Sequence, residues 1–280
     1  MFISTLHHSI LSFFHGLLLF SPAMTEEPTD SAFVSELFSS VQGEGLNIGR
    51  RQLFVRFCEC HRRCLYCDTN IERTEYLQIE REPGSGEFTR EPNPVSLDRL
   101  LELITEMNRP EFAHDDLFIT GGEPLLYTDF LEKMLPEARK RLNLPIHLET
   151  SSDMPEELAR LAAWIDHVLM DIKLPSVTGE AETWDAHQAF LEQIVASGTG
   201  ATIKLVVNAD TAQDDFQQAA RLILASGSAS AVVLQPMTAT LQTDRVPSAK
   251  QVLDWQAQMA LALGRGVRII PQTHKMMGLL

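Results

Sequence analysis

Short apolar runs alternate with longer amphipathic segments along most of the chain. Seven runs of four or five residues are rich in β-branched side chains, as is typical of buried parallel strands; they cover residues 53–57, 117–120, 146–150, 168–172, 203–207, 232–235 and 267–270. Six intervening segments repeat apolar residues at three- and four-residue spacing and predict helices; they cover residues 97–107, 130–142, 156–164, 184–195, 212–225 and 249–263. This alternation predicts an α/β fold with a parallel sheet and right-handed crossovers.

Unusual polar residues stand at or just beyond the C-terminal ends of these predicted strands. They are residues 120–123, 149–151, 171–173, 235–236 and 272–274, together with a group of cysteines after residue 57. Parallel α/β folds place active sites at this end of the sheet. With about six core strands, the pattern favours a partial (β/α)6 barrel. Residues 70–94, rich in Glu, Arg, Pro and Gly, are interpreted as a long loop or insertion over its mouth.

Composition narrows the class of protein. The chain of 280 residues has 23 basic and 38 acidic side chains, a formal net charge of −15, so it lacks the basic surface expected of a nucleic-acid binder. A hydrophobic fraction of 44% with 7% aromatics fits a globular domain. We therefore predict a single domain over residues 24–280 and no nucleic-acid partner.

All four cysteines lie within residues 58–67. Disulfide frameworks spread cysteines along a chain, and a chain of this length can bury a sufficient core without them. The spacing of Cys60, Cys64 and Cys67 lets one loop wrap three thiolates around one centre. Structural zinc usually takes four protein ligands, often as two separated pairs, and no second pair exists here.

An iron-sulfur cluster is therefore favoured over structural zinc and over inert thiols. A four-iron cluster held by three thiolates leaves one iron with an open position, as a catalytic metal requires. Cys58 remains a possible fourth ligand, although on a strand its side chain would follow the pleat rather than the loop.

The cysteine spacing, with Tyr66 just before the last cysteine, resembles the cluster motif of the radical S-adenosylmethionine (SAM) superfamily, and Gly-Gly-Glu-Pro at 121–124 resembles its second motif. The resemblance implies the same partial (β/α)6 barrel, a [4Fe-4S] cluster on Cys60, Cys64 and Cys67, and reductive cleavage of SAM at the open iron. It also implies a set of SAM-binding residues: Tyr66, Cys67, Asp68, Gly121, Gly122, Glu123, Glu149, Ser151, Asp171, Lys173, Gln235, Pro236, Met237 and Thr238.

Several of these residues also have ordinary structural explanations. The paired glycines would suit a bare turn. Ser152 or Asp153 would cap a helix that begins near Pro155. Asp171 and Lys173 would share one face of a strand and pair with charges on neighbouring strands. For that last pair the two interpretations are equally favoured.

A narrower resemblance rests on five further motifs: Gln-Gly-Glu-Gly at 42–45, Arg-Phe at 56–57, Cys-Asp-Thr at 67–69, Asp-Ile-Lys at 171–173 and Gln-Thr-His-Lys at 272–275. Together, from about residue 33 to 280, they resemble the 7-carboxy-7-deazaguanine synthase family. This implies ring contraction of 6-carboxy-5,6,7,8-tetrahydropterin with loss of ammonia, on the route to queuosine and other deazapurines. The implied substrate contacts are Val41, Gln42, Gly43, Glu44, Arg56, Thr120, His274 and the carboxylate of Leu280.

The family resemblance also implies partners and a second metal. Thr69 is expected to ligate a Mg²⁺ ion that touches the substrate. An electron donor such as flavodoxin and a homodimeric assembly are expected. From the residues alone, Arg56 would need an anion if it is buried at the barrel mouth.

Two departures from the family pattern concern the cysteine loop. Cys58 and Glu59 replace the small residues common before the first cluster cysteine, and His-Arg-Arg at 61–63 makes the loop unusually basic. These differences are expected to alter the access of solvent to the cluster, its reduction potential and the docking of an electron donor. Two other functions stay open: a radical SAM activating enzyme for a glycyl-radical partner protein, and a zinc-binding interaction module.

The first 23 residues differ from the rest. Residues 10–20 are mostly apolar and precede Ser-Pro-Ala at 21–23, which resembles a short secretory leader. The segment has no Lys or Arg at its start, is too short to span a bilayer, and would send an oxygen-sensitive cluster to an oxidising compartment. We therefore predict an over-extended start, translation from Met24, and a cytoplasmic product without membrane association.

Overall fold

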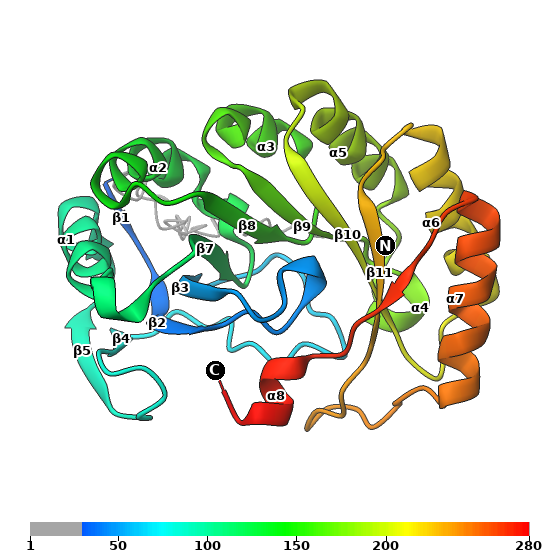
Figure 1. Cartoon of the computed structure of the whole chain (residues 1–280), viewed down its shortest axis with the longest axis horizontal. Helices are drawn as coiled ribbons and strands as arrows, with labels where there is room; N and C mark the ends of the chain where they lie inside the picture. The colour runs from blue at the N-terminus through cyan, green and yellow to red at the C-terminus, as the bar shows by residue number, and fades with distance from the viewer. Residues whose placement is uncertain (1–29, 280) are drawn as a thin grey trace, which may run out of the picture.

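The computed structural model describes residues 30–279 and is built around one curved sheet (Figure 1). Its strand order is β12-β11-β10-β9-β8-β7-β3-β2-β4-β5. The part from β3 to β12 is parallel throughout and follows the chain order. These strands are β3 (Arg51–Phe57), β7 (Asp116–Gly121), β8 (Ile146–Thr150), β9 (His167–Asp171), β10 (Gly200–Val207), β11 (Ala231–Pro236) and β12 (Arg268–Ile269). The predicted β/α alternation and partial barrel are confirmed.

The predicted helices cover the outer face of this sheet, as Figure 1 shows. Their apolar stripes pack against the outward residues of the strands to form the main core. The helices are α1 (Leu97–Met107), α2 (Thr128–Leu142), α3 (Pro155–Leu161), α5 (Trp184–Ser197), α6 (Gln213–Ala225) and α7 (Ala249–Leu263). Shorter elements are β1 (Ser31–Ala32), β6 (Val95–Ser96), α4 (Pro175–Thr178), α8 (Thr273–Met277) and 3-10 turns at Gly45–Asn47, Pro110–Phe112, Pro124–Tyr127 and Ala162–Trp164.

Strand alternation decides which side chains reach the inner face. On β3, Leu53, Val55 and Phe57 belong to the outer core, whereas Phe54 stacks on Phe38 in a separate small cluster. The registers Gln52↔Asp116, Phe54↔Phe118 and Arg56↔Thr120 continue this inner row onto β7. The inner face is thus polar near the strand starts, apolar in the middle and polar again at the strand ends.

Two parts of the sheet were not predicted. Strand β2 (Val34–Val41) pairs antiparallel with β3, and its serines and Glu36 interrupt the apolar pattern that would reveal it. The predicted loop at 70–94 contains β4 (Tyr76–Glu80) and β5 (Phe88–Pro92), a hairpin that extends the sheet beyond β2. Strand β5 is a polar edge strand without apolar alternation, so the loop interpretation was wrong for these residues.

Within residues 30–279, no helix combines the length and the apolar character needed to cross a membrane. The predicted leader at 1–23 and the predicted start at Met24 lie outside the described residues.

Candidate active site

A cavity of about 520 Å³ opens at the C-terminal ends of the parallel strands. Most of the residues that were predicted to bind the cluster, SAM, Mg²⁺ and the substrate line this cavity. Those lining it are Val41, Gln42, Gly43, Glu44, Arg56, Cys60, Cys64, Tyr66, Cys67, Asp68, Thr69, Thr120, Gly121, Gly122, Glu149, Ser151, Asp171, Lys173, Gln235, Met237, Thr238 and His274. Segments more than 200 residues apart in sequence therefore meet in one site.

Two predicted site residues, Glu123 and Pro236, do not line the cavity. The carboxylate of Glu123 is fully buried beside it, and Pro236 lies outside its lining. Leu280 lies outside the described residues, although the preceding Leu279 does line the cavity.

The cysteine loop presents three thiols to this cavity. Cys60, Cys64 and Cys67 are free and line it, and a turn closed by Cys67 N–H donating to Cys64 O at 3.0 Å brings the last two together. Cys58 is fully buried and does not line the cavity; its Sγ lies 3.8 Å from Oγ1 of Thr74, which does line it. Unlike the other three thiols, Cys58 is therefore not presented to the cavity.

The donor set fits an iron-sulfur cluster. Among residues 30–279, no three His, Cys, Asp or Glu side chains gather closely enough for one metal ion, whereas the three thiols share a cavity wide enough for a larger group. Burial raises the pKa of the Cys64 thiol to about 12 and also raises the pKa of Cys60. Cluster binding must therefore displace protons from these thiols.

The paired glycines let their strand end lie against the cysteine loop. A Cβ on Gly122 would lie 1.9 Å from Glu59 O, and one on Gly121, whose φ is +141°, would lie 2.3 Å from Phe57 O. Gly122 N–H donates to Phe57 O at 3.1 Å, and Glu123 N–H donates to Glu59 O at 2.8 Å. These glycines therefore serve a close backbone approach rather than a bare turn.

The buried carboxylate of Glu123 makes several hydrogen bonds next to the cavity. Its carboxylate accepts hydrogen bonds from Thr150 Oγ1 at 2.8 Å, Ser151 N–H at 2.7 Å, Ser151 Oγ at 2.6 Å and Leu125 N–H at 3.0 Å. Burial raises its pKa although these bonds oppose the shift. These four bonds let Glu123 hold the end of β8, and its contact with SAM stays a prediction.

The basic residues of the cysteine loop are paired with carboxylates. The guanidinium of Arg62, 6% exposed, lies 2.6 Å from Asp153 Oδ2 and 3.2 Å from Glu180 Oε2. His61 Nε2 lies 2.9 Å from Asp153 Oδ2. Burial alone would raise the pKa of Asp153, but these hydrogen bonds and the charge of Arg62 hold it far below its usual range. The loop is thus anchored by ion pairs, and Arg62 itself also lines the cavity.

Asp153 and Ser152 have other roles than the predicted helix cap. The residue before α3 is Met154, and no side chain caps that helix. Ser152 instead adopts a left-handed conformation with φ of +61°, and its Oγ accepts from Asp171 N–H at 3.1 Å. The predicted N-cap was wrong because these residues bind the neighbouring strand end and the cysteine loop.

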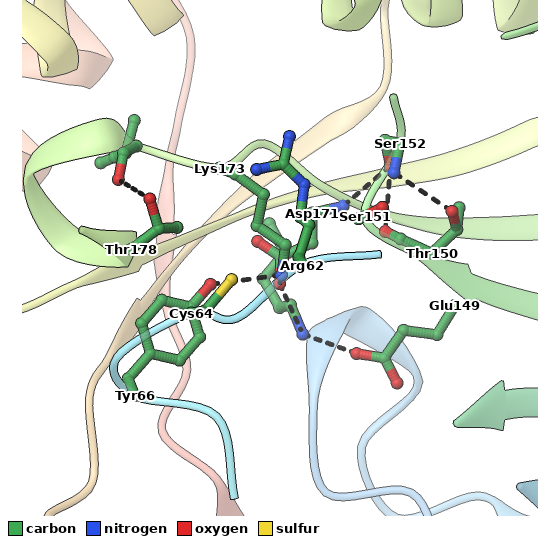
Figure 2. Close-up of polar contacts among 12 residues, drawn as sticks. Arg62, Cys64, Tyr66, Glu149, Thr150, Ser151, Ser152, Asp171, Lys173 and Thr178 are labelled. Carbon is green, nitrogen blue, oxygen red and sulfur yellow. Dashed lines mark hydrogen bonds and ion pairs between the residues drawn. The ribbon is translucent and has the colours of Figure 1, made fainter. Parts of the chain in front are cut away.

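Asp171 and Lys173 face each other inside the cavity, next to Tyr66 (Figure 2). Lys173 Nζ lies 2.7 Å from Asp171 Oδ2 and 3.2 Å from the Tyr66 hydroxyl. His187 fixes this region from behind: its Nδ1 bonds to Ser152 O at 2.8 Å, and its Nε2 accepts from Lys173 N–H at 3.1 Å. The two residues therefore pair with each other, whereas the predicted pairing with a neighbouring strand is found only for Asp171, whose Oδ2 lies 3.5 Å from Lys204 Nζ.

Lys204 is a charged residue of the cavity that the sequence analysis missed, as are Glu36 and Arg62. Its Nζ lies 2.6 Å from Glu44 Oε2, 2.6 Å from Glu149 Oε1 and 3.5 Å from Asp171 Oδ2. Burial opposes the charge of Lys204, but the carboxylates raise its pKa well above the usual value. Burial likewise opposes ionisation of Glu44, yet Lys204 and Gln272 lower its pKa to about 2. A lone lysine inside the apolar run 203–207 was the available signal.

The opposite wall carries the predicted substrate residues. A Cβ on Gly43 would lie 2.1 Å from His274 Nδ1, so the glycine allows these distant segments to meet. Thr273 N–H donates to Gly43 O at 2.9 Å and fixes the approach. Burial lowers the pKa of His274, which keeps its imidazole neutral at pH 7. Arg56 lines the cavity too; its side chain is half-buried and pairs with Glu36 Oε2 at 2.8 Å.

Comparisons with known proteins agree with this site. The sequence model of the radical SAM superfamily matches residues 55–223. A 7-carboxy-7-deazaguanine synthase from Geobacter sulfurreducens is 41% identical over 88% of this chain and 97% of its own length. One from Methanopyrus kandleri is 30% identical over 89% of this chain and 94% of its own.

A solved structure shares the fold. The crystal structure of QueE from Escherichia coli matches with a TM-score of 0.51 at 19% identity, covering 86% of this chain and 94% of that chain. This structural match shows the fold, whereas the sequence matches identify the family. The chain belongs to the radical SAM superfamily and, within it, to the 7-carboxy-7-deazaguanine synthase family.

Proposed function

We propose that this enzyme converts 6-carboxy-5,6,7,8-tetrahydropterin to 7-carboxy-7-deazaguanine with release of ammonia, a step of queuosine and deazapurine biosynthesis. The observation that carries the proposal is the meeting of two sets of residues in one cavity. The first set is the three cysteines with the Gly121–Gly122 strand end, and the second is Gln42, Glu44 and His274.

The two sets of residues would have different functions. Cys60, Cys64 and Cys67 would hold the [4Fe-4S] cluster, and Tyr66, Asp68, Gly121, Gly122 and the nearby carboxylates would hold SAM. When bound, the cluster and SAM supply the radical chemistry, while the side chains bind the pterin, orient it and exclude water. Lys204 joins the two sets, since it pairs with Glu44 of one and with Glu149 of the other.

A Mg²⁺ ion is part of the proposal. Thr69 lines the cavity two residues after Cys67 and offers a hydroxyl oxygen. Mg²⁺ is a hard cation that prefers oxygen ligands and retains waters, so Thr69 together with substrate oxygens is a suitable shell. The ion would orient the pterin and neutralise charge on its carboxylate.

The remaining parts of the proposal concern the protein's context. We expect an electron donor such as flavodoxin, a homodimer, and a cytoplasmic product of a single domain that starts at Met24. Size-exclusion chromatography with light scattering tests the dimer, and N-terminal sequencing of the native protein tests the start.

Anaerobic reconstitution with iron and sulfide, followed by incubation with carboxytetrahydropterin, SAM, Mg²⁺ and a reductant, tests the activity. Mass spectrometry should detect 7-carboxy-7-deazaguanine and one equivalent of ammonia without any partner protein. A glycyl-radical activating enzyme would require a protein substrate, and a zinc module would remain colourless. Either result would contradict the proposal.

A further inference from the structure

Two buried glutamines connect the start of β7 with the floor of the cavity. Gln52 Nε2 donates to Asp116 Oδ1 at 2.6 Å, and Gln52 Oε1 accepts from Gln42 Nε2 at 2.9 Å. Gln42 Oε1 in turn accepts from the backbone N–H of Glu44 at 2.9 Å. Gln52 and Asp116 are completely buried and Gln42 is 5% exposed. The three bonds form an uninterrupted chain from Asp116 to Glu44.

The Glu44 end of this chain determines the direction of every bond. The N–H of Glu44 can only donate, so Gln42 must turn Oε1 toward it and Nε2 toward Gln52. Gln52 must then accept with Oε1 and turn Nε2 toward Asp116, whose Oδ1 accepts and whose pKa is raised to about 7 by burial. Reversing either amide would set donor against donor or acceptor against acceptor in a buried site, which leaves polar groups unsatisfied.

Only one end of the chain touches the cavity. Gln42 and Glu44 line it, whereas Gln52 and Asp116 do not. Asp116 is held by Arg50 Nε at 3.2 Å from Oδ2 and by His147 Nδ1 at 3.4 Å from Oδ1. The far end is thus fixed to the barrel wall and can act on a ligand only through Gln42 and Glu44.

We propose that Gln52 and Asp116 are positioning residues that orient the Gln42 amide and the Glu44 backbone for substrate. This inference rests on the proposed function, which assigns Gln42 and Glu44 to the pterin. Nε2 and Oε1 of Gln42 each make one of these hydrogen bonds. One N–H and one oxygen lone pair of the amide therefore remain for a ligand, and both point in a fixed direction. Such preorganisation lowers the entropy lost on binding.

The first test replaces one hydrogen-bond donor by an acceptor and then restores the donor–acceptor match. Gln52→Glu places a carboxylate against Asp116, so the floor should shift and the KM for carboxytetrahydropterin should rise roughly tenfold or more. Adding Asp116→Asn supplies an amide that donates to the new carboxylate, which still accepts from Gln42. The double variant should return to within about threefold of the wild-type KM. Asp116→Asn alone should have little effect, because its carbonyl oxygen can still accept from Gln52.

Other readouts separate positioning from general damage. Iron content and substrate-independent SAM cleavage should match wild type in all three variants. Gln217→Glu makes the same change on the exposed face of α6 and should leave KM unchanged. If Gln52→Glu does not fold, Gln52→Met breaks both bonds without a charge and should raise KM in a way that Asp116→Asn does not rescue.

The inference is overturned if Gln52→Glu and Gln52→Met keep the wild-type KM, if the double variant is no better than Gln52→Glu, or if SAM cleavage falls together with turnover. Failure of the wild type to convert the pterin would instead refute the proposed function. In that case, amide exchange of residues 42–50 still decides the inference. Exchange should be faster in Gln52→Glu and restored in the double variant, and equal exchange in all would refute it.

Discussion

Gly122 lies directly against the carbonyl oxygen of Glu59, so close that a Cβ would approach that oxygen to 1.9 Å. Glu59 itself has a left-handed backbone with φ of +61°, and its carboxylate is held by the Tyr127 hydroxyl at 2.6 Å and by Arg73 Nε at 2.9 Å. The residue before the first cluster cysteine therefore has no need to be small, since these side-chain bonds oppose the strain of a non-glycine residue there. The glycine is required on the opposite side of this contact.

Gly122→Ala should disturb the cysteine loop because the added methyl group meets backbone, which cannot rotate away. We expect a loss of about 1–3 kcal/mol in stability and a clear fall in iron bound per chain after anaerobic reconstitution, measured by colorimetric iron analysis. Gly266→Ala is the matched control, because nothing lies within 4 Å of its Cβ position. Equal iron content in the two variants would contradict this role of Gly122.

Lys204→Met should destabilise the cavity wall, because it leaves Glu44 and Glu149 without the ammonium group that lies 2.6 Å from each. Breaking a buried ion pair on one side costs about 3–5 kcal/mol. The midpoint of denaturant unfolding should fall accordingly, and the KM for the pterin should rise. Lys250→Met removes an ion pair whose lysine is 83% exposed and should leave both unchanged. A Lys204→Met protein as stable as wild type would show that the carboxylates do not depend on this lysine.

The sequence predicted those strands whose apolar residues follow one another along the chain. Residues 203–207 and 232–235 are buried on both faces and apolar except for Lys204 and Gln235, so their strands were recognisable. Strand β2 was not, because Ser35, Glu36, Ser39 and Ser40 interrupt its apolar residues. Its place in the sheet comes from pairing with β3, a contact between segments that no local pattern encodes.

For the site, sequence motifs identified the residues but not their roles. Glu123 was recognised from its motif, yet its four hydrogen-bond donors come partly from Thr150 and Ser151 at the end of another strand. Likewise, the counter-ions of Arg62 are Asp153 and Glu180, about 90 and 120 residues farther along the chain. Such pairings depend on the register between strands, so they could be seen only in the folded chain.

His187 should make the protein less stable in mild acid. Its Nδ1 bonds to a carbonyl oxygen and its Nε2 accepts from an N–H, so the folded site requires a neutral ring. Burial lowers its pKa to about 4 from the ordinary 6.5. The unfolded chain therefore binds the proton first, and between these values the stability contributed by His187 falls by about 1.4 kcal/mol per pH unit on acidification.

The variant His187→Asn isolates this contribution, since its amide can still donate to Ser152 O but does not titrate. The difference in unfolding free energy between wild type and the variant should shrink as the pH is lowered from 7.5 to 5. His114 and His147, whose pKa values are also lowered to about 4 by burial, are present in both proteins and cancel in the difference. A difference that stays constant over this range would show that His187 does not titrate on unfolding.

Thr69→Ala should separate Mg²⁺ dependence from SAM chemistry. The hydroxyl lies in the cavity close to the cysteine loop but is not one of the thiol donors, so its loss should spare iron content and SAM cleavage. The Mg²⁺ concentration needed for half-maximal turnover should rise at least about tenfold. Thr69→Ser keeps the oxygen ligand and should retain the wild-type Mg²⁺ requirement. An equal loss of SAM cleavage and turnover in Thr69→Ala, or a serine variant as impaired as the alanine variant, would place the function of Thr69 in loop structure rather than in metal binding.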